Sequence, residues 1–157
     1  LVRMMAQRGI PPEEMQQFLH PRLMDLTDPL LMPDMKPAVD RVLQAVDTGE
    51  NIVVYGDYDV DGITSVTLMT QILSAYRSSV RSFIPRRGAE GYGLNSAALE
   101  RCMKEGEKPS LLITVDCGTA SIDEIATLKN EGIDVIVVDH HELPPAGGWK
   151  RCTMAMT

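Results

Sequence analysis

The segment that decides the fold is Val54-Tyr55-Gly56-Asp57-Tyr58-Asp59-Val60-Asp61-Gly62-Ile63-Thr64, in which an apolar run ends in three closely spaced aspartates. No Lys or Arg occurs between Arg41 and Arg77. In an extended or gently turned chain, alternate residues point the same way, so these three carboxylates would crowd one surface. Such crowding raises pKa values and costs stability unless a cation neutralises it, and hard divalent ions prefer carboxylate oxygen. The segment therefore predicts a metal site directly after a buried strand.

Four apolar runs of strand length alternate with helix patterns over residues 51–138. The predicted strands are residues 52–55, 80–84, 111–115 and 133–138. The helix after the first strand has an apolar stripe made of Ile63, Val66, Met69, Leu73 and Tyr76. Asn95 is expected to cap a second helix, and Ser121 with Glu124 a third. Continuous Val/Ile/Leu strands separated by amphipathic helices indicate a parallel sheet buried on both faces, a doubly wound α/β domain.

Three parts of the chain differ in pattern. Residues 1–50 predict a helical N-terminal segment, with helices near residues 2–8, 11–19 and 35–49. The last of these helices is expected to bury one face, formed by Ala38, Val39, Val42, Leu43 and Val46. Residues 51–146 form the α/β domain, and residues 147–157 form a tail with neither a strand nor a helix pattern.

Composition limits the class of protein. With 157 residues, 44% hydrophobic and 24% charged, the chain has the size and character of about one globular domain. There is no apolar run long enough to span a bilayer and no signal peptide pattern. The three cysteines show no paired spacing, which favours reduced thiols and a cytoplasmic protein. The formal net charge of −7 argues against a broad basic surface for nucleic acid.

Acids and histidines follow three of the four predicted strands. The first strand runs into the aspartate segment, the third ends in Asp116-Cys117-Gly118, and the fourth ends in Asp139-His140-His141. In open α/β sheets, ligands bind beyond the carboxyl ends of the strands, so we expect these side chains to converge. Convergent acids with perturbed pKa values are typical of functional sites.

Residue spacing distinguishes between alternative interpretations of the aspartates. An EF-hand calcium loop starting at Asp57 needs a Glu at its twelfth position, where the chain has Leu68, and it needs a preceding helix. A phosphate-binding P-loop is excluded because no Gly-Lys-Ser/Thr follows the first strand. Zinc is an alternative through His140, but the surplus of oxygen ligands favours Mg²⁺ or Mn²⁺. Carboxylates with one or two imidazoles can hold two metals about 3.5–4 Å apart, which predicts metal-dependent phosphoester hydrolysis.

Three motifs give the chain a family resemblance. Gly56–Gly62, Val115–Gly118 and Asp139–Glu142 resemble the first three motifs of the DHH phosphoesterase superfamily. More narrowly, the chain resembles the RecJ type of single-strand-specific 5′→3′ DNA exonuclease, over roughly residues 5–146. This narrower resemblance rests on Gln7-Arg8-Gly9-Ile10, Phe18-Leu19, Asp28-Pro29, Pro85-Arg86-Arg87 and Glu90-Gly91-Tyr92-Gly93-Leu94. It implies a hydrolase of single-stranded DNA in DNA repair and recombination that uses Mn²⁺ or Mg²⁺. A single-strand-binding protein or a helicase is the implied partner.

The resemblance also implies roles for individual residues. The implied metal ligands are Asp59, Asp61, Asp116 and His140, with Asp116 bridging two metals. The implied catalytic residues are Asp57, Asp139 and His141; the two acids would bind metal or support the site, and His141 would orient it or contact the scissile phosphate. Arg87 would pair with a DNA phosphate and Tyr92 would stack near a base, although the glycines beside Tyr92 could serve only a tight turn.

The chain departs from the family pattern in one respect. Enzymes of this type carry a further aspartate motif and a second domain downstream, which the chain does not show. We therefore expect an incomplete metal site with weak metal binding and no turnover by this chain alone. Two alternatives remain: another DHH phosphodiesterase, acting on short oligonucleotides, cyclic dinucleotides or pyrophosphate, and a non-catalytic RecJ-like replication scaffold. Tyr55 stands where a pyrophosphatase would have His, and a scaffold tends to lose the acids that are intact here.

Overall fold

The computed structural model describes residues 1–76 and 78–142. The tail expected at residues 147–157 and the domain end expected at residue 146 lie outside the described residues. By its contacts the chain divides into two compact units, Leu1–Leu31 and Met32–Thr157. The helix near residues 35–49, which the sequence pattern groups with the N-terminal segment, belongs to the second unit.

The first unit consists of short helices, as the sequence predicts. They are α1 (Val2–Gln7), α2 (Met15–Leu19), η1 (Leu23–Asp25) and η2 (Pro29–Leu31). The second helix begins later than expected, because the two prolines start a tight turn in which Glu14 N–H donates to the carbonyl of Pro11 at 3.0 Å. Within the unit Met5 is buried, whereas Phe18 and most other large apolar side chains are exposed.

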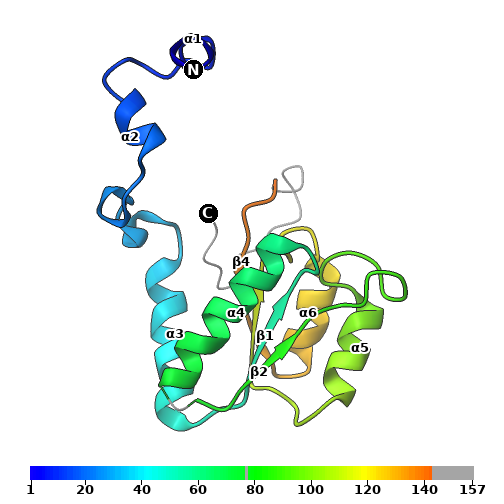
Figure 1. Cartoon of the computed structure of the whole chain (residues 1–157). Coiled ribbons are helices and arrows are strands. Elements are labelled where there is room, and N and C mark those ends of the chain that lie inside the picture. The colour runs from blue at the N-terminus through cyan, green and yellow to red at the C-terminus, as the bar shows by residue number, and fades with distance from the viewer. Residues whose placement is uncertain (77, 143–157) are drawn as a thin grey trace. The chain divides into compact units, whose positions relative to one another are not determined.

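The second unit is an α/β domain built on a parallel sheet (Figure 1). Its elements are α3 (Met35–Thr48), β1 (Ile52–Gly56), α4 (Val60–Ala75), β2 (Val80–Phe83), α5 (Ser96–Lys104), β3 (Leu111–Val115), α6 (Ile122–Asn130) and β4 (Asp134–Val138). The strand order is β2-β1-β3-β4, and each neighbouring pair is parallel. This order confirms the predicted doubly wound fold, in which β1 and β3 lie at the centre.

Helices cover both faces of the sheet. On one face, Ala38 and Ala45 of α3 and Val66 and Leu73 of α4 pack against alternate strand residues such as Val54. On the other face, α5 and α6 pack against the remaining strand residues; Ala98, Cys102 and Leu128 contribute to this cluster. β1 and β3 are buried along their whole length, which explains their unbroken apolar sequences.

The predicted apolar stripes of two helices are buried in part. In α4, Val66 and Leu73 are buried as predicted and Gly62 is buried as well, whereas Ile63 is exposed at 45% and Tyr76, the residue after the helix, at 66%. A Cβ atom on Gly62 would lie 2.3 Å from the carbonyl oxygen of Asp57, so the helix approaches the preceding loop at this glycine. In α3, Ala38 is buried and Val42 and Val46 pack against the core as predicted, whereas Val39 and Leu43 are exposed.

The two predicted helix caps differ in outcome. Asn95 caps α5 as expected, its side-chain oxygen accepting from Ala98 N–H at 3.0 Å. The capping box at α6 is wrong. The Ser121 hydroxyl donates instead to the carbonyl of Leu94 at 2.7 Å, and Glu124 accepts from Ser96 of α5.

Two further features concern the described part of the chain. None of its helices combines the length and the apolar character needed to cross a membrane. Cys102 and Cys117 are buried free thiols, and Cys152 lies outside the described residues.

Candidate metal centre

The loop between β1 and α4 places two aspartates at the carboxyl edge of the sheet. Asp57 is fully buried. Asp59 is the N-cap of α4, and its Oδ1 accepts from the N–H groups of Asp61 and Gly62, each at 3.0 Å. These hydrogen bonds, led by that of Gly62, hold the pKa of Asp59 below its usual value. Because α4 starts at this point, the ionised carboxylate of Asp59 is held beside the buried carboxylate of Asp57.

Asp116 follows β3 in a left-handed backbone conformation, with φ of 60°. Asp adopts this region more readily than most residues, and the turn aims its carboxylate back toward the loop after β1. Asp116 N–H donates to the carbonyl of Val138 at 2.9 Å, which ties the turn to β4. Burial and then the negative charge of Asp59 raise the pKa of Asp116.

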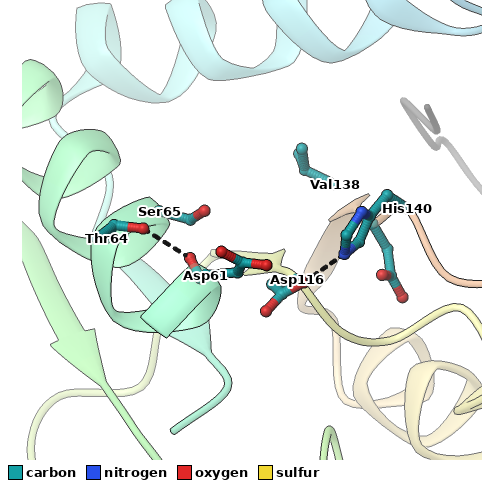
Figure 2. Close-up of a pocket in the computed structure, with 7 residues that line it drawn as sticks. Asp61, Thr64, Ser65, Asp116, Val138 and His140 are labelled. Atoms are coloured by element: carbon teal, nitrogen blue, oxygen red, sulfur yellow. Dashed lines mark hydrogen bonds and ion pairs between the residues drawn. The ribbon is translucent and has the colours of Figure 1, made fainter. Parts of the chain in front are cut away.

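The end of β4 contributes one acid and two histidines. His140 Nε2 lies 3.0 Å from Asp116 Oδ1, as Figure 2 shows. His141 Nδ1 lies 2.6 Å from Asp139 Oδ1, and Thr119 N–H donates to the other oxygen of Asp139 at 3.0 Å. Burial alone would raise the pKa of Asp139, but the hydrogen bonds from Thr119 and His141 outweigh it and lower this pKa. The same Asp139 contact raises the pKa of His141.

These side chains form two groups with the spacing of metal ligands. One group consists of Asp57, Asp59 and Asp116, and the other of Asp116, His140 and His141; within each, one ligand atom per residue lies within 4.8 Å of the others. Both oxygens of Asp57 and Oδ2 of Asp116 are buried without a hydrogen-bond partner among the described residues. Leaving buried carboxylate oxygens unpaired is costly, so the site fits a cation. Carboxylate oxygens with imidazole nitrogens suit Mn²⁺ or Mg²⁺.

A pocket of about 280 Å³ opens at the second group. Its lining consists of Asp61, Thr64, Ser65, Asp116, Val138, Asp139 and His140 (Figure 2).

The structure thus places every sequence-predicted metal or catalytic residue at one edge of the sheet, but not all of them belong to a ligand group. Asp57, Asp59, Asp116, His140 and His141 belong to the two ligand groups. Asp61 and Asp139 lie outside both. Asp61 is exposed at the pocket wall, with its N–H bonded to Asp59, and Asp139 contacts His141. The individual roles of these residues remain predictions.

The two predicted DNA contacts, Arg87 and Tyr92, lie beside this centre, and both contact Tyr58. Tyr92 Oη is 3.2 Å from His141 Nε2, and its ring stands edge-on to Tyr58 with centroids 6.0 Å apart. The Arg87 guanidinium carbon lies 5.3 Å from the centroid of the Tyr58 ring. Burial, followed by the nearby aspartate charges, raises the pKa of Tyr92 to about 12, so its hydroxyl stays protonated.

Sequence reasoning missed Tyr58 and Thr119. Tyr58 lies within the aspartate segment, and its aromatic character between two acids is a usable signal. Thr119 acts through its backbone N–H, which every residue except proline carries, so the sequence offers no signal.

Comparison with known proteins agrees with this geometry. The family model described as "DHH family, N-terminal domain" matches residues 51–152. The single-stranded-DNA-specific exonuclease RecJ of Bacillus subtilis is 42% identical over 143 residues, covering 90% of this chain and 18% of that protein. The protein of the same name from Thermus thermophilus is 37% identical over 152 residues, covering 91% of this chain and 22% of its own length.

Solved structures give the same result. A crystal structure of exonuclease RecJ bound to manganese matches with a TM-score of 0.72 and 30% identity, over 83% of this chain and 33% of that one. RecJ from Thermus thermophilus in complex with Mg²⁺ matches with a TM-score of 0.52 and 27% identity, over 87% of this chain and 15% of that one.

The fold and the acid-lined strand ends define an α/β domain with a candidate metal centre, and the chain belongs to the DHH family. Within that family, the Bacillus subtilis and Thermus thermophilus relatives are RecJ exonucleases, which are hydrolases. The chain spans about a fifth of the length of the curated relatives it matches.

Proposed function

We propose that this chain provides most of the metal ligands of a 5′→3′ exonuclease that hydrolyses phosphodiester bonds of single-stranded DNA. The observation that carries the proposal is the pair of ligand groups sharing Asp116. A shared carboxylate between two groups is suited to holding two cations near one phosphate, and the relatives are named for single-strand-specific exonuclease activity.

In this proposal the residues after the strand ends would hold the metals. Asp57, Asp59 and Asp116 would hold one cation, and Asp116 and His140 would hold the other. Mn²⁺ or Mg²⁺ bound there would neutralise phosphate charge and activate a water for attack. Asp61, which lines the pocket, would be an additional ligand. The carboxylates follow strand ends or lie at the start of α4, so we expect little reorganisation on substrate binding.

The remaining residues position the DNA. Asp139 fixes the imidazole of His141 through Nδ1, which leaves Nε2 facing Tyr92 and the substrate side. His141 would contact the scissile phosphate there. Arg87 would pair with a neighbouring phosphate, and the rings of Tyr58 and Tyr92 would stack on an unpaired base. A base inside a duplex does not offer its face to such rings, which favours single strands.

The proposal also concerns the regions that are present in the longer relatives. The net charge of −7 and the small number of aromatic residues suit metal binding better than a complete DNA groove. We therefore propose that regions present in the longer relatives complete the groove and the metal site, and that this chain alone has no turnover. A single-strand-binding protein or a helicase is the proposed partner, and the cytoplasm the proposed location.

The test uses the protein at the full length of its relatives and compares digestion of 5′-ended single-stranded and duplex DNA with Mn²⁺. We expect Asp116→Asn to lower the rate at least about 100-fold, because it removes the charge shared by both metals. Asp134→Asn is the matched control, since Asp134 is an exposed acid at the opposite end of β4 and should leave the rate unchanged.

Three outcomes separate the alternatives. Equal rates for Asp116→Asn and wild type would refute the two-metal proposal. Hydrolysis of dinucleotides or pyrophosphate without digestion of DNA would favour another DHH phosphodiesterase. Wild-type protein that binds Mn²⁺ but hydrolyses none of these substrates would favour the non-catalytic scaffold.

A further inference from the structure

The loop from Pro85 to Leu94 connects β2 to α5 and carries both predicted DNA contacts. It contains no regular helix or strand, yet it holds Tyr92 within hydrogen-bond distance of His141 and Arg87 over Tyr58. A segment without secondary structure keeps such positions only when other contacts fix it. The structure shows two anchors, one on each side of Tyr92.

The first anchor joins Glu90 of the loop to Arg101 of α5. Both Glu90 oxygens accept from the Arg101 guanidinium, through Nε and through Nη2, the latter at 3.0 Å. One of these oxygens also accepts from Arg86 N–H at 2.7 Å, which closes the turn that contains Arg87. Glu90 is therefore bonded at the same time to the helix and to the start of its own loop.

Arg101 is itself held by the sheet. Its Nη2 donates to the carbonyl of Ile84 at 3.0 Å, and its guanidinium carbon lies 4.1 Å from the centroid of the Phe83 ring. Nη1 donates to Glu105, one turn further along α5, at 2.7 Å. The side chains of Arg101 and Glu90 are only 22% and 10% exposed. A planar fork with this many bonds has a defined orientation that a lysine could not reproduce.

The second anchor lies at Gly93. The buried hydroxyl of Tyr55 donates to the Gly93 carbonyl at 2.9 Å, and the Asn95 side chain donates to the same oxygen at 3.1 Å. Gly91 and Gly93 both have left-handed backbones, with φ of 83° and 67°. The chain therefore turns sharply on each side of Tyr92 and is fixed beyond each turn.

We propose that Arg101 is a positioning residue for the DNA-contacting loop: through Glu90 it sets where Arg87 and Tyr92 stand relative to the metal centre. The proposal rests on the proposed function for its DNA readout, and on the loop geometry alone for its structural readout. Neither Arg101 nor Glu90 reaches the ligand groups, so the pair is expected to govern DNA binding and not metal binding.

Variants of both partners test this in the full-length protein. We call the Glu90–Arg101 ion pair the clamp. Glu90→Gln removes its negative charge, and Arg101→Lys keeps the positive charge but loses the planar guanidinium that binds both Glu90 oxygens. Glu105→Gln is the matched control, because it removes the other carboxylate bound to Arg101 without touching the loop. Hydrogen–deuterium exchange of residues 86–94 reports on the loop whether or not the protein digests DNA. Mn²⁺ titration reports on the metal centre.

We expect Glu90→Gln to speed amide exchange in residues 86–94 and to raise the KM for single-stranded DNA roughly tenfold, with kcat changed less than about twofold. Mn²⁺ affinity should not change, Arg101→Lys should give a smaller increase in KM, and Glu105→Gln should match wild type. In an Arg87→Ala background, Glu90→Gln should raise KM by a smaller factor than it does in wild type, because part of its effect is exerted through that arginine and the rest through Tyr92.

Three results would contradict the proposal. Exchange in residues 86–94 that is unchanged by Glu90→Gln would overturn the proposal, even if the wild-type protein had no exonuclease activity. Faster exchange with fully additive KM effects in the double variant would also overturn it. A lower Mn²⁺ affinity in Glu90→Gln would show that the pair supports the metal centre instead.

Discussion

At the scale of single residues, the centre depends on backbone positions that admit few side chains. Gly62 lies where α4 passes the carbonyl of Asp57, and this close approach lets the Gly62 N–H reach Asp59. Asp116 keeps a left-handed backbone that directs its carboxylate toward the same loop. The acids are thus positioned by the residues between them as much as by the strands before them.

Gly62→Ala should therefore disrupt the protein and the centre together. A Cβ atom 2.3 Å from backbone oxygen cannot be relieved by a rotamer change, so α4 or the Asp57 loop must move. Overpacking of this kind costs about 1–3 kcal/mol in the free energy of unfolding, and moving backbone costs more. Urea unfolding should show the loss, and Mn²⁺ affinity should fall. Gly88→Ala, where a Cβ atom meets nothing within 4 Å, should leave both unchanged; an equal effect of the two substitutions would contradict the explanation.

At the scale of elements, the sequence predicts the sheet well because its signals are local. Ile52 to Tyr55 is apolar at every position, and its short length and β-branched residues favour a strand buried on both faces, as the structure shows. The burial of Gly62 on α4 escapes prediction because glycine has no apolar side chain to mark a buried position. Ser121 escapes it as well: its hydroxyl bonds to Leu94, a partner 27 residues away that local patterns cannot supply.

The clamp between the loop and α5 gives a pH dependence at this scale. The Arg101 contact lowers the pKa of Glu90 from an ordinary 4.5 to about 2. Because the folded pKa is the lower one, the ionised carboxylate stabilises the fold above about pH 4.5, and this contribution is lost as pH falls toward 2. The melting temperature of wild type should thus exceed that of Glu90→Gln at pH 5–7, with the gap closing below pH 4.5. A gap that stays constant down to pH 2 would argue against an ionised clamp.

At the scale of the whole molecule, residues far apart in the sequence meet at one edge of the sheet. Asp57, Asp116 and Asp139 end three strands that are adjacent in space. Convergence was predictable from parallel topology. The division into two ligand groups was not, because it depends on how Asp59 caps α4 and on the backbone angle of Asp116.

Burying several carboxylates at one site destabilises the metal-free protein, and bound metal should reverse this effect. Asp57 is fully buried, and neither oxygen has a hydrogen-bond partner among the described residues, so its charge destabilises the metal-free protein. In metal-free buffer Asp57→Asn should melt at or above the wild-type temperature. Mn²⁺ at 100 times its dissociation constant should stabilise wild type by about 2.7 kcal/mol per site, and the variant much less.

Differential scanning fluorimetry with and without Mn²⁺ measures both effects. Asp47→Asn, which changes an exposed acid of α3, should respond to Mn²⁺ as wild type does. A clear loss of melting temperature for metal-free Asp57→Asn would mean that the carboxylate has a protein partner, contrary to this account.

The strand order also has a consequence for synthesis on the ribosome. β1 lies between β2 and β3, so both of its neighbours are made after it. At about 5–20 residues per second, the first residue of β2 appears roughly 1–5 s after β1 is complete, and that of β3 roughly 3–11 s after. During this interval α3 is already made, and its Ala38 and Ala45 belong to the cluster that covers one face of β1. The helix that precedes the sheet in the sequence is thus the first cover for a nascent strand that would otherwise be open to aggregation.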